Sequence, residues 1–302
     1  MSSSNYAIEL PVLGIATRFE TNDFDVAHCM EEAFGMWRTL AASDGSREPP
    51  LLVRIDVVEG EEGPLPADGH VLVRNSCPDD VRVVVETAGS VGMSDPLRRE
   101  ARARVTQALV ADRMHFRTEM LEAITLALLS HFDRHPVHAA AVALNGRAVL
   151  LAAPSGTGKS TLAYHCHLDG LDLLGDDHVR VQLEPRVRVW GWPARVRLLT
   201  NRAAASAGAK EVIHLHTEMT PARLVADEMR VCCLTRDGGP ASLEQLDAVS
   251  LASALDEQMA PGFDRFPARW PAVLDALARR GGWRLNLSSD PWEGVQLVRR
   301  LM

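Results

Sequence analysis

The sequence has no excess of basic residues and no paired-cysteine motif. Its 302 residues carry a formal net charge of −8, whereas nucleic acid and anionic membranes attract proteins through basic surfaces. We therefore expect neither nucleic acid nor a membrane surface as a partner. The five cysteines include no C-x-x-C pair, so their spacing indicates neither a zinc knuckle nor a disulfide framework.

Targeting and membrane-spanning patterns are missing as well. The first ten residues, MSSSNYAIEL, lack the basic stretch and apolar run of a secretory signal. The most apolar segment, residues 120–132, contains Glu122 and is shorter than the roughly 20 residues that cross a bilayer. We expect a buried helix there and a protein of the reducing cytoplasm, which the odd number of cysteines also favours.

The chain also lacks internal repeats and low-complexity tracts, and its length allows two modest domains that each bury a core. Short strand-like runs fill the first hundred residues, whereas helical and strand-like segments alternate from Arg117 onward. We predict an α/β protein with a smaller, β-rich α+β domain at residues 1–116 and a larger domain at 117–302. The smaller domain is expected to bind a substrate or partner.

Turn and cap signals predict several elements of the larger domain. Asn145-Gly146 lies between two apolar runs and predicts a hairpin, because both residues tolerate positive φ. Apolar spacing predicts helices at residues 242–259 and 267–280. A last helix is expected to begin after Asp290, which is suited to cap it.

Residues 153–160, A-P-S-G-T-G-K-S, match the phosphate-binding pattern G-x-x-x-x-G-K-[ST] except that Ala153 replaces the first glycine. In this pattern main-chain N–H groups turn toward phosphate oxygens, Lys159 reaches the β- and γ-phosphates, and the Ser160 hydroxyl binds Mg²⁺. We therefore predict ATP and Mg²⁺ as cofactors. The residues expected to bind the nucleotide are Ser155, Gly156, Thr157, Gly158, Lys159, Ser160 and Thr161.

Lysine is scarce in a chain that otherwise uses arginine. Lys159 and Lys210 are its only lysines, although lysine and arginine together number 32. A compact ammonium at this one position indicates that point-charge geometry matters there. This favours a phosphate-binding loop over a coincidental glycine-rich turn.

An acid pair follows the next buried strand-like run, in L-L-G-D-D-H at residues 173–178. We expect this strand to lie directly beside the strand that leads into the glycine-rich loop. Of two such carboxylates, one can hold the Mg²⁺ shell and the other can orient or deprotonate an acceptor hydroxyl. Asp176 and Asp177 are the candidates, and the sequence leaves open which takes which role.

The segment P-V-H-A-A-A-V-A-L-N-G through G-D-D-H-V-R-V, residues 136–181, resembles the catalytic core of the HPr kinase/phosphorylase family. It is more distantly similar to the nucleotide-binding core of phosphoenolpyruvate carboxykinase. The resemblance implies a P-loop kinase core in which His138 lies close to the acid pair. It further implies Lys159 on the β- and γ-phosphates, Asp176 as the base and Asp177, with Ser160, on Mg²⁺.

The downstream glutamate-arginine-glycine signature of that family is absent, and V-W-G-W-P-A-R-V-R-L-L stands in its place. This replacement resembles a subgroup of HPr-kinase-like proteins associated with ribosomal peptides, including lasso peptides. The resemblance implies phosphorylation of a hydroxyl on a precursor peptide. Arg195 and Arg197 could contact the transferred phosphoryl group, since kinases need a cation there.

Together these patterns predict an ATP-dependent kinase that acts on a serine or threonine hydroxyl of a peptide or small protein. Two alternatives stay open, a kinase of a small-molecule hydroxyl and a regulatory module that binds nucleotide without turnover. Related kinases form rings or smaller assemblies, and the sequence leaves open whether this chain forms a homo-oligomer.

Overall fold

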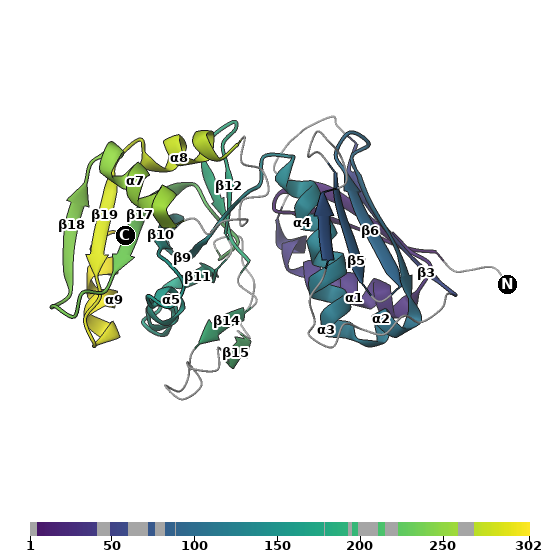
Figure 1. The fold of residues 1–302 in the computed structure, drawn as a ribbon, viewed down its shortest axis with the longest axis horizontal. Coiled ribbons are helices and arrows are strands. Elements are labelled where there is room, and N and C mark those ends of the chain that lie inside the picture. Colours follow the sequence, from purple (N-terminus) through teal and green to yellow (C-terminus); the bar gives the residue numbers. More distant parts are fainter. Residues whose placement is uncertain are drawn as a thin grey trace. The chain divides into compact units, whose positions relative to one another are not determined.

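The computed structural model describes residues 5–40, 49–59, 72–75, 82–87, 89–177, 179–192, 195–198, 211–214, 223–258 and 269–302. The chain divides into two compact units, Met1–Phe132 and Asp133–Met302 (Figure 1). This division lies beyond the boundary predicted between residues 116 and 117. The reason is that helix α4 (Ala123–Ser130) packs on the sheet of the first unit.

The first unit is built on a seven-stranded mixed sheet in the order β1-β2-β3-β7-β6-β5-β4. Outside Leu72–Asn75, side chains alternate between more and less buried positions along its strands, because successive residues of a strand face opposite sides of a sheet. The strands are β1 (Tyr6–Val12), β2 (Ile15–Thr21), β3 (Leu51–Val58), β4 (Leu72–Asn75), β5 (Val83–Thr87), β6 (Ser90–Asp95) and β7 (Glu100–Thr106).

Helices cover the apolar face of this sheet. α1 contacts β1 and β2, and α4 contacts β5, β6 and β7. The helical segment that contains Met120 lies very close to the sheet at Gly92 of β6, where a Cβ would lie 2.5 Å from the sulfur of Met120. The buried helix expected at 120–132 is thus confirmed, although its first part is π-helical. The helices are α1 (Phe24–Phe34), η1 (Gly35–Thr39), α2 (Gln107–Ala111), α3 (Arg113–His115), η2 (Phe116–Glu122) and α4.

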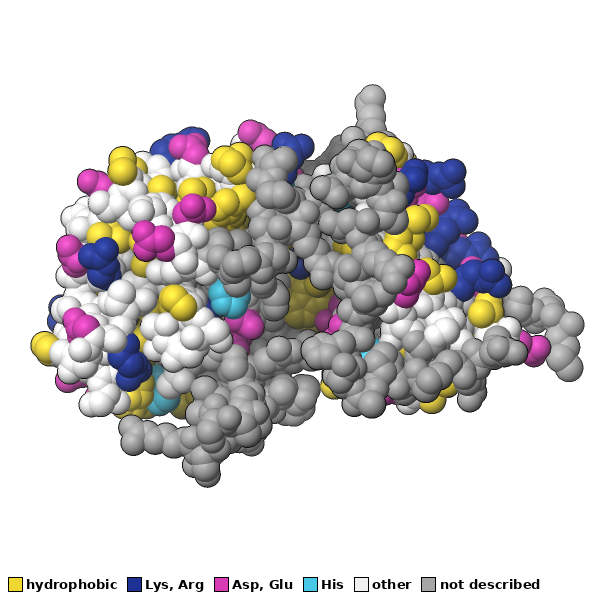
Figure 2. Space-filling view, viewed as in Figure 1, with side chains coloured by type: hydrophobic (Ala, Val, Ile, Leu, Met, Phe, Trp, Pro, Cys, Tyr) yellow, Lys and Arg dark blue, Asp and Glu magenta, His cyan; other side chains and the backbone are white. Residues whose placement is uncertain are grey.

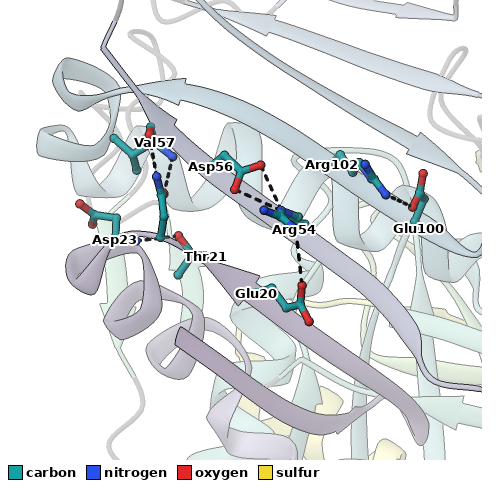
Figure 3. Close-up of polar contacts among 9 residues, drawn as sticks. Glu20, Thr21, Asp23, Arg54, Asp56, Val57, Glu100 and Arg102 are labelled. Carbon is teal, nitrogen blue, oxygen red and sulfur yellow. Dashed lines mark hydrogen bonds and ion pairs between the residues drawn. The ribbon is translucent and has the colours of Figure 1, made fainter. Parts of the chain in front are cut away.

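Charged side chains occupy the opposite face of the same sheet. Arg54 on β3 lies between Glu20 on β2 and Asp56 on its own strand, and Arg102 pairs with Glu100 on β7 (Figure 3). Figure 2 shows arginine side chains gathered on a surface of this unit. The face therefore carries ion pairs in contact with solvent, and one of them, between Arg54 and Glu20, joins two strands.

The second unit has a six-stranded sheet in the order β11-β9-β10-β17-β19-β18. Strands β10, β17 and β19 run parallel, and β9 joins β10 through the predicted hairpin, in which Asn145 and Gly146 both have positive φ. The strands are β9 (Ala139–Leu144), β10 (Arg147–Ala152), β11 (Asp172–Gly175), β17 (Glu228–Thr235), β18 (Ser242–Leu246) and β19 (Gly282–Asn286).

The structure corrects the predicted neighbour of the strand that precedes the acid pair. That strand, β11, pairs with β9 and not with β10. The hairpin folds β9 onto the side of β10 where β11 was expected, so β11 adds to the free edge of β9. The acid pair and the glycine-rich loop are consequently separated by the width of one strand.

Helices cover both faces of the six-stranded sheet, which confirms the α/β class (Figure 1). α5 (Lys159–Leu168) and α9 (Pro291–Arg299) bury apolar side chains on one face, and α7 (Ala248–Gln258) and α8 (Trp270–Ala278) on the other. The helix predicted at 242–259 is wrong in its first part, because Ser242–Leu246 pairs with β19 as strand β18. The helix predicted at 267–280 is confirmed over Trp270–Ala278, while residues 267 and 268 lie outside the described part. The Asp290 cap is confirmed.

Two smaller sheets complete the second unit. A four-stranded sheet has the order β16-β13-β12-β8, and β14 pairs with β15. Across the described ranges, no helix is long and apolar enough to span a membrane. The strands are β8 (His135–Val137), β12 (Val179–Gln182), β13 (Arg188–Trp190), β14 (Arg195–Leu198), β15 (Glu211–His214) and β16 (Val225–Ala226).

Candidate functional site

The glycine-rich loop connects the end of β10 to the start of α5. Gly156 and Gly158 have φ values of +87° and +121°, which side chains with a Cβ rarely adopt. The turn therefore depends on both glycines. It ends at the N-terminus of α5, where unpaired main-chain N–H groups and the helix dipole favour an anion.

Sheet topology brings the loop and the acid pair to the same end of the six-stranded sheet, where β10 and β11 both end. The last residue of β10, Ala152, is in register with Ala139 at the start of β9, and Gly175 at the end of β11 is in register with Ala141. Asp176 and Asp177 follow β11 directly, and His138 directly precedes β9. Both acids are half-buried, and Oδ1 of Asp176 is shielded from solvent.

Lys159 lies buried beneath the loop, with a residue exposure of 5%. Its Nζ donates a hydrogen bond of 2.6 Å to the carbonyl of Ala153 and lies 3.1 Å from Nε2 of His138. Ala153 is fully buried, so alanine at the first position of the motif supplies its carbonyl to the lysine from inside the core. The loop thus keeps its lysine in place without the first glycine.

His138 links this lysine to the acid pair. Its Nδ1 lies 3.4 Å from Oδ1 of Asp177. We assign the proton of the neutral imidazole to Nδ1. The Lys159 ammonium can only donate, so Nε2 accepts from it, and the remaining nitrogen, Nδ1, carries the hydrogen that faces the carboxylate. The three side chains form a continuous polar path across the edge of β9, the strand that separates the loop from the acids.

Neighbouring strands hold His138 and Asp177 at this distance. In the small sheet Val137, which directly precedes His138, pairs with Val179, which lies two residues after Asp177. Asp177 has a φ of +70°, a conformation that aspartate and asparagine adopt more readily than most residues. On the other side of β11, Gly191 packs so tightly that a Cβ would lie 2.0 Å from the carbonyl oxygen of Leu174.

The other predicted site residues are placed as follows. Ser155 and Gly156 are exposed at the top of the loop, and Ser160 and Thr161 are half-buried in the first turn of α5. Arg195 and Arg197 belong to β14, which contacts α5, but their side chains lie outside the described part of the structure.

One side chain at the loop was not singled out from the sequence. Arg236 follows β17, and its Nε donates to the carbonyl of Thr157 at 3.4 Å. Its Nη2 also lies 3.3 Å from the position that a Cβ on Gly158 would occupy. Its only sequence signal is that it directly follows a buried strand, which does not reveal that this strand lies beside β10.

Comparisons with known proteins give little beyond this geometry. No protein-family model and no curated protein matches the chain. Among solved structures, the chain is similar to the Hpr(Ser) kinase/phosphatase from Coxiella burnetii, with 12% sequence identity and a TM-score of 0.34. The alignment covers 56% of this chain and 96% of that one.

Proposed function

We propose that the second unit is an ATP-dependent kinase that transfers a phosphoryl group to a serine or threonine hydroxyl of a peptide or small protein. The observation that supports this most is the path from Lys159 through His138 to Asp177. It connects a loop suited to polyphosphate with a carboxylate suited to a metal ion or an acceptor. A helix cap alone would require neither the histidine nor the acids.

Residues 155–161 would hold the triphosphate of ATP through main-chain N–H groups and the Lys159 ammonium. In the structure this ammonium contacts a carbonyl oxygen and an imidazole nitrogen. A phosphate oxygen is a stronger acceptor than either, because hydrogen bonds between two charged groups are shorter and stronger. Lys159 would therefore turn from Ala153 toward the nucleotide.

The Ser160 hydroxyl and the Asp177 carboxylate are the residues that would hold Mg²⁺. Both are oxygen ligands, which Mg²⁺ prefers, and its usual shell combines one or two protein ligands with phosphate oxygens and several waters. When bound, the ion would supply positive charge that neutralises the charge developing on the phosphates. His138 would keep the Asp177 carboxylate oriented through Nδ1–H.

Asp176 would act on the acceptor. The acceptor hydroxyl gives its proton to the Asp176 carboxylate, its oxygen bonds to the γ-phosphorus, and the bond between that phosphorus and the ADP oxygen breaks. We propose Arg195 and Arg197 as cations for the transferred group. Their strand contacts α5, whose N-terminus follows the loop.

A precursor of a ribosomal peptide, such as a lasso peptide, is the acceptor that we propose. The proposal rests on the residues 189–199, V-W-G-W-P-A-R-V-R-L-L, and their resemblance to the peptide-modifying subgroup. The first unit would then bind the peptide outside the reacting segment.

Transfer of label from [γ-³²P]ATP to a library of serine- and threonine-containing peptides tests the kinase. We expect Mg²⁺-dependent labelling by the wild-type chain and a loss of at least about 100-fold in Asp176→Asn, the magnitude typical of a missing general base. Undiminished labelling by the variant would remove Asp176 from that role. Nucleotide binding without labelling of any acceptor would instead indicate a regulatory nucleotide-binding module.

A further inference from the structure

Arg236 lies on the side of the glycine-rich loop that faces away from the acid pair. The sheet order places β9 and β11 on one side of β10, and β17 and β19 on the other. β17 runs parallel to β10 and extends beyond it, since Ala152 at the end of β10 is in register with Cys233. Arg236 therefore leaves its strand beside the loop, at the same edge of the sheet.

Hydrogen bonds from the end of β19 hold the main chain that follows β17 and carries Arg236. Asn286, the last residue of β19, is 7% exposed. Its Nδ2 donates to Oδ1 of Asp237 at 2.6 Å and to the carbonyl of Pro240 at 3.1 Å, and its Oδ1 accepts from the Asp237 N–H at 3.1 Å. The turn after β17 is thus held in one conformation, and it presents the Arg236 side chain toward the loop.

The contact that Arg236 makes is weak compared with the one that its chemistry allows. Its guanidinium donates to a neutral carbonyl, that of Thr157, over 3.4 Å, whereas a guanidinium and an anionic oxygen approach to about 2.7–2.9 Å. Arg236 is exposed, and no carboxylate pairs with it in the described ranges. Many other arginines of the second unit pair with acids, among them Arg147, Arg186, Arg188, Arg223, Arg284 and Arg299.

We infer that Arg236 binds an inner phosphate of the nucleotide, and this inference rests on the proposed nucleotide site. The transferred phosphoryl group must face His138 and Asp177, on the β9 side of the loop. A phosphate that Arg236 reaches from the β17 side is therefore one that ADP and ATP share. Arg236 therefore strengthens nucleotide binding, whereas Lys159 and the acid pair contact the phosphoryl group that is transferred.

Calorimetric titration of the full chain with ADP and with ATP, in the presence of Mg²⁺, tests the assignment. In Arg236→Gln we expect the Kd of both nucleotides to rise by a similar factor of about 10-fold to 100-fold, as for the loss of a charged hydrogen bond. Arg236→Lys retains the charge but loses the planar fork, so it should fall between wild type and Arg236→Gln.

Arg280→Gln is the matched control. Arg280 is exposed and precedes the start of β19, at the edge of the sheet opposite the loop, so its loss should leave both Kd values unchanged. An unchanged Kd in Arg236→Gln, or an increase confined to ATP, would overturn the assignment to an inner phosphate. Failure of the wild-type chain to bind either nucleotide would overturn the proposed function itself, a result distinguishable from either.

Discussion

Nε2 of His138 lies 3.1 Å from Nζ of Lys159, so the residue before β9 touches the first residue of α5. The other ring nitrogen faces Asp177. His138 is therefore placed to position both the loop lysine and the acid.

Replacement of His138 by alanine should slow phosphoryl transfer more than it weakens nucleotide binding. We expect kcat to fall by about 10-fold to 100-fold, the equivalent of one hydrogen bond to a charged group, and the Kd of ADP to change by less. Initial rates at saturating ATP and an ADP titration measure the two effects. His167→Ala, in the last turn of α5, is the control, and equal losses in both variants would contradict the positioning role.

Asp177 allows its charge to be separated from its backbone conformation. Asparagine tolerates a φ of +70° nearly as well as aspartate, whereas alanine in that region costs about 1–2 kcal/mol. We expect Asp177→Asn to unfold in urea as the wild type does and yet to lose at least about 100-fold in labelling. Asp177→Ala should lose activity and stability together. Asp177→Gly should restore the stability that Asp177→Ala loses but not the activity. Full labelling by Asp177→Asn would argue against a carboxylate that holds the metal ion.

Gly191 should be among the least replaceable residues next to the site. A Cβ there would lie 2.0 Å from the Leu174 carbonyl oxygen in the rigid main chain of β11, so Gly191→Ala should cost about 3 kcal/mol or more in the free energy of unfolding. Urea unfolding measures the loss. Gly170→Ala is the matched variant, because Gly170 has a φ of +91° with no atom within 4 Å, and it should cost only about 1–2 kcal/mol. Similar losses in both variants would mean that β11 yields to the added methyl group.

Asp133 should contribute a pH-dependent part of the stability. Burial pushes the pKa of Asp133 upward, but the hydrogen bonds with His135 and with the N–H groups of Glu184 and Leu183 outweigh it and hold the pKa below its ordinary value. Stability from a carboxyl with a lowered pKa is present above its unfolded pKa of about 4 and is lost as the pH falls through the folded value.

Asp133→Asn should therefore lower the free energy of unfolding at pH 7 by about 1–3 kcal/mol. The difference between wild type and variant should shrink as the pH falls below about 4. Urea titrations at pH 7, 5, 4 and 3 would show this convergence, and a difference that stays constant over that range would contradict it. Asparagine tolerates the φ of +59° at this position, so strain does not complicate the comparison.

Local sequence signals were sufficient for many elements of the fold. The Asn145-Gly146 hairpin and the Asp290 cap depend on neighbouring residues alone, and both are confirmed. Residues 242–246 were predicted as helix because their apolar spacing runs on into α7. Main-chain pairing with β19 determines that segment instead, and partners that lie 36 to 44 residues later in the chain leave no local signal.

The same distinction applies to the site. Spacing along the chain identified the loop and the acids, and the resemblance placed His138 near them. The sequence could not reveal that β9 separates β10 from β11, because strand order depends on the free edge with which a later strand pairs. Arg236 was missed for the same reason, since only the position of β17 beside β10 brings it to Thr157.

The charged face of the first sheet has a consequence for how copies of this chain meet. If this face were apolar, it could stack on the sheet of a second copy. Stacking of the charged face would instead require Arg54, Arg102 and their acid partners to lose water, at a cost of several kcal/mol for each ion. Individually such surface ion pairs add at most about 1 kcal/mol to folding. Their larger effect is to make sheet-to-sheet aggregation in concentrated solution unfavourable.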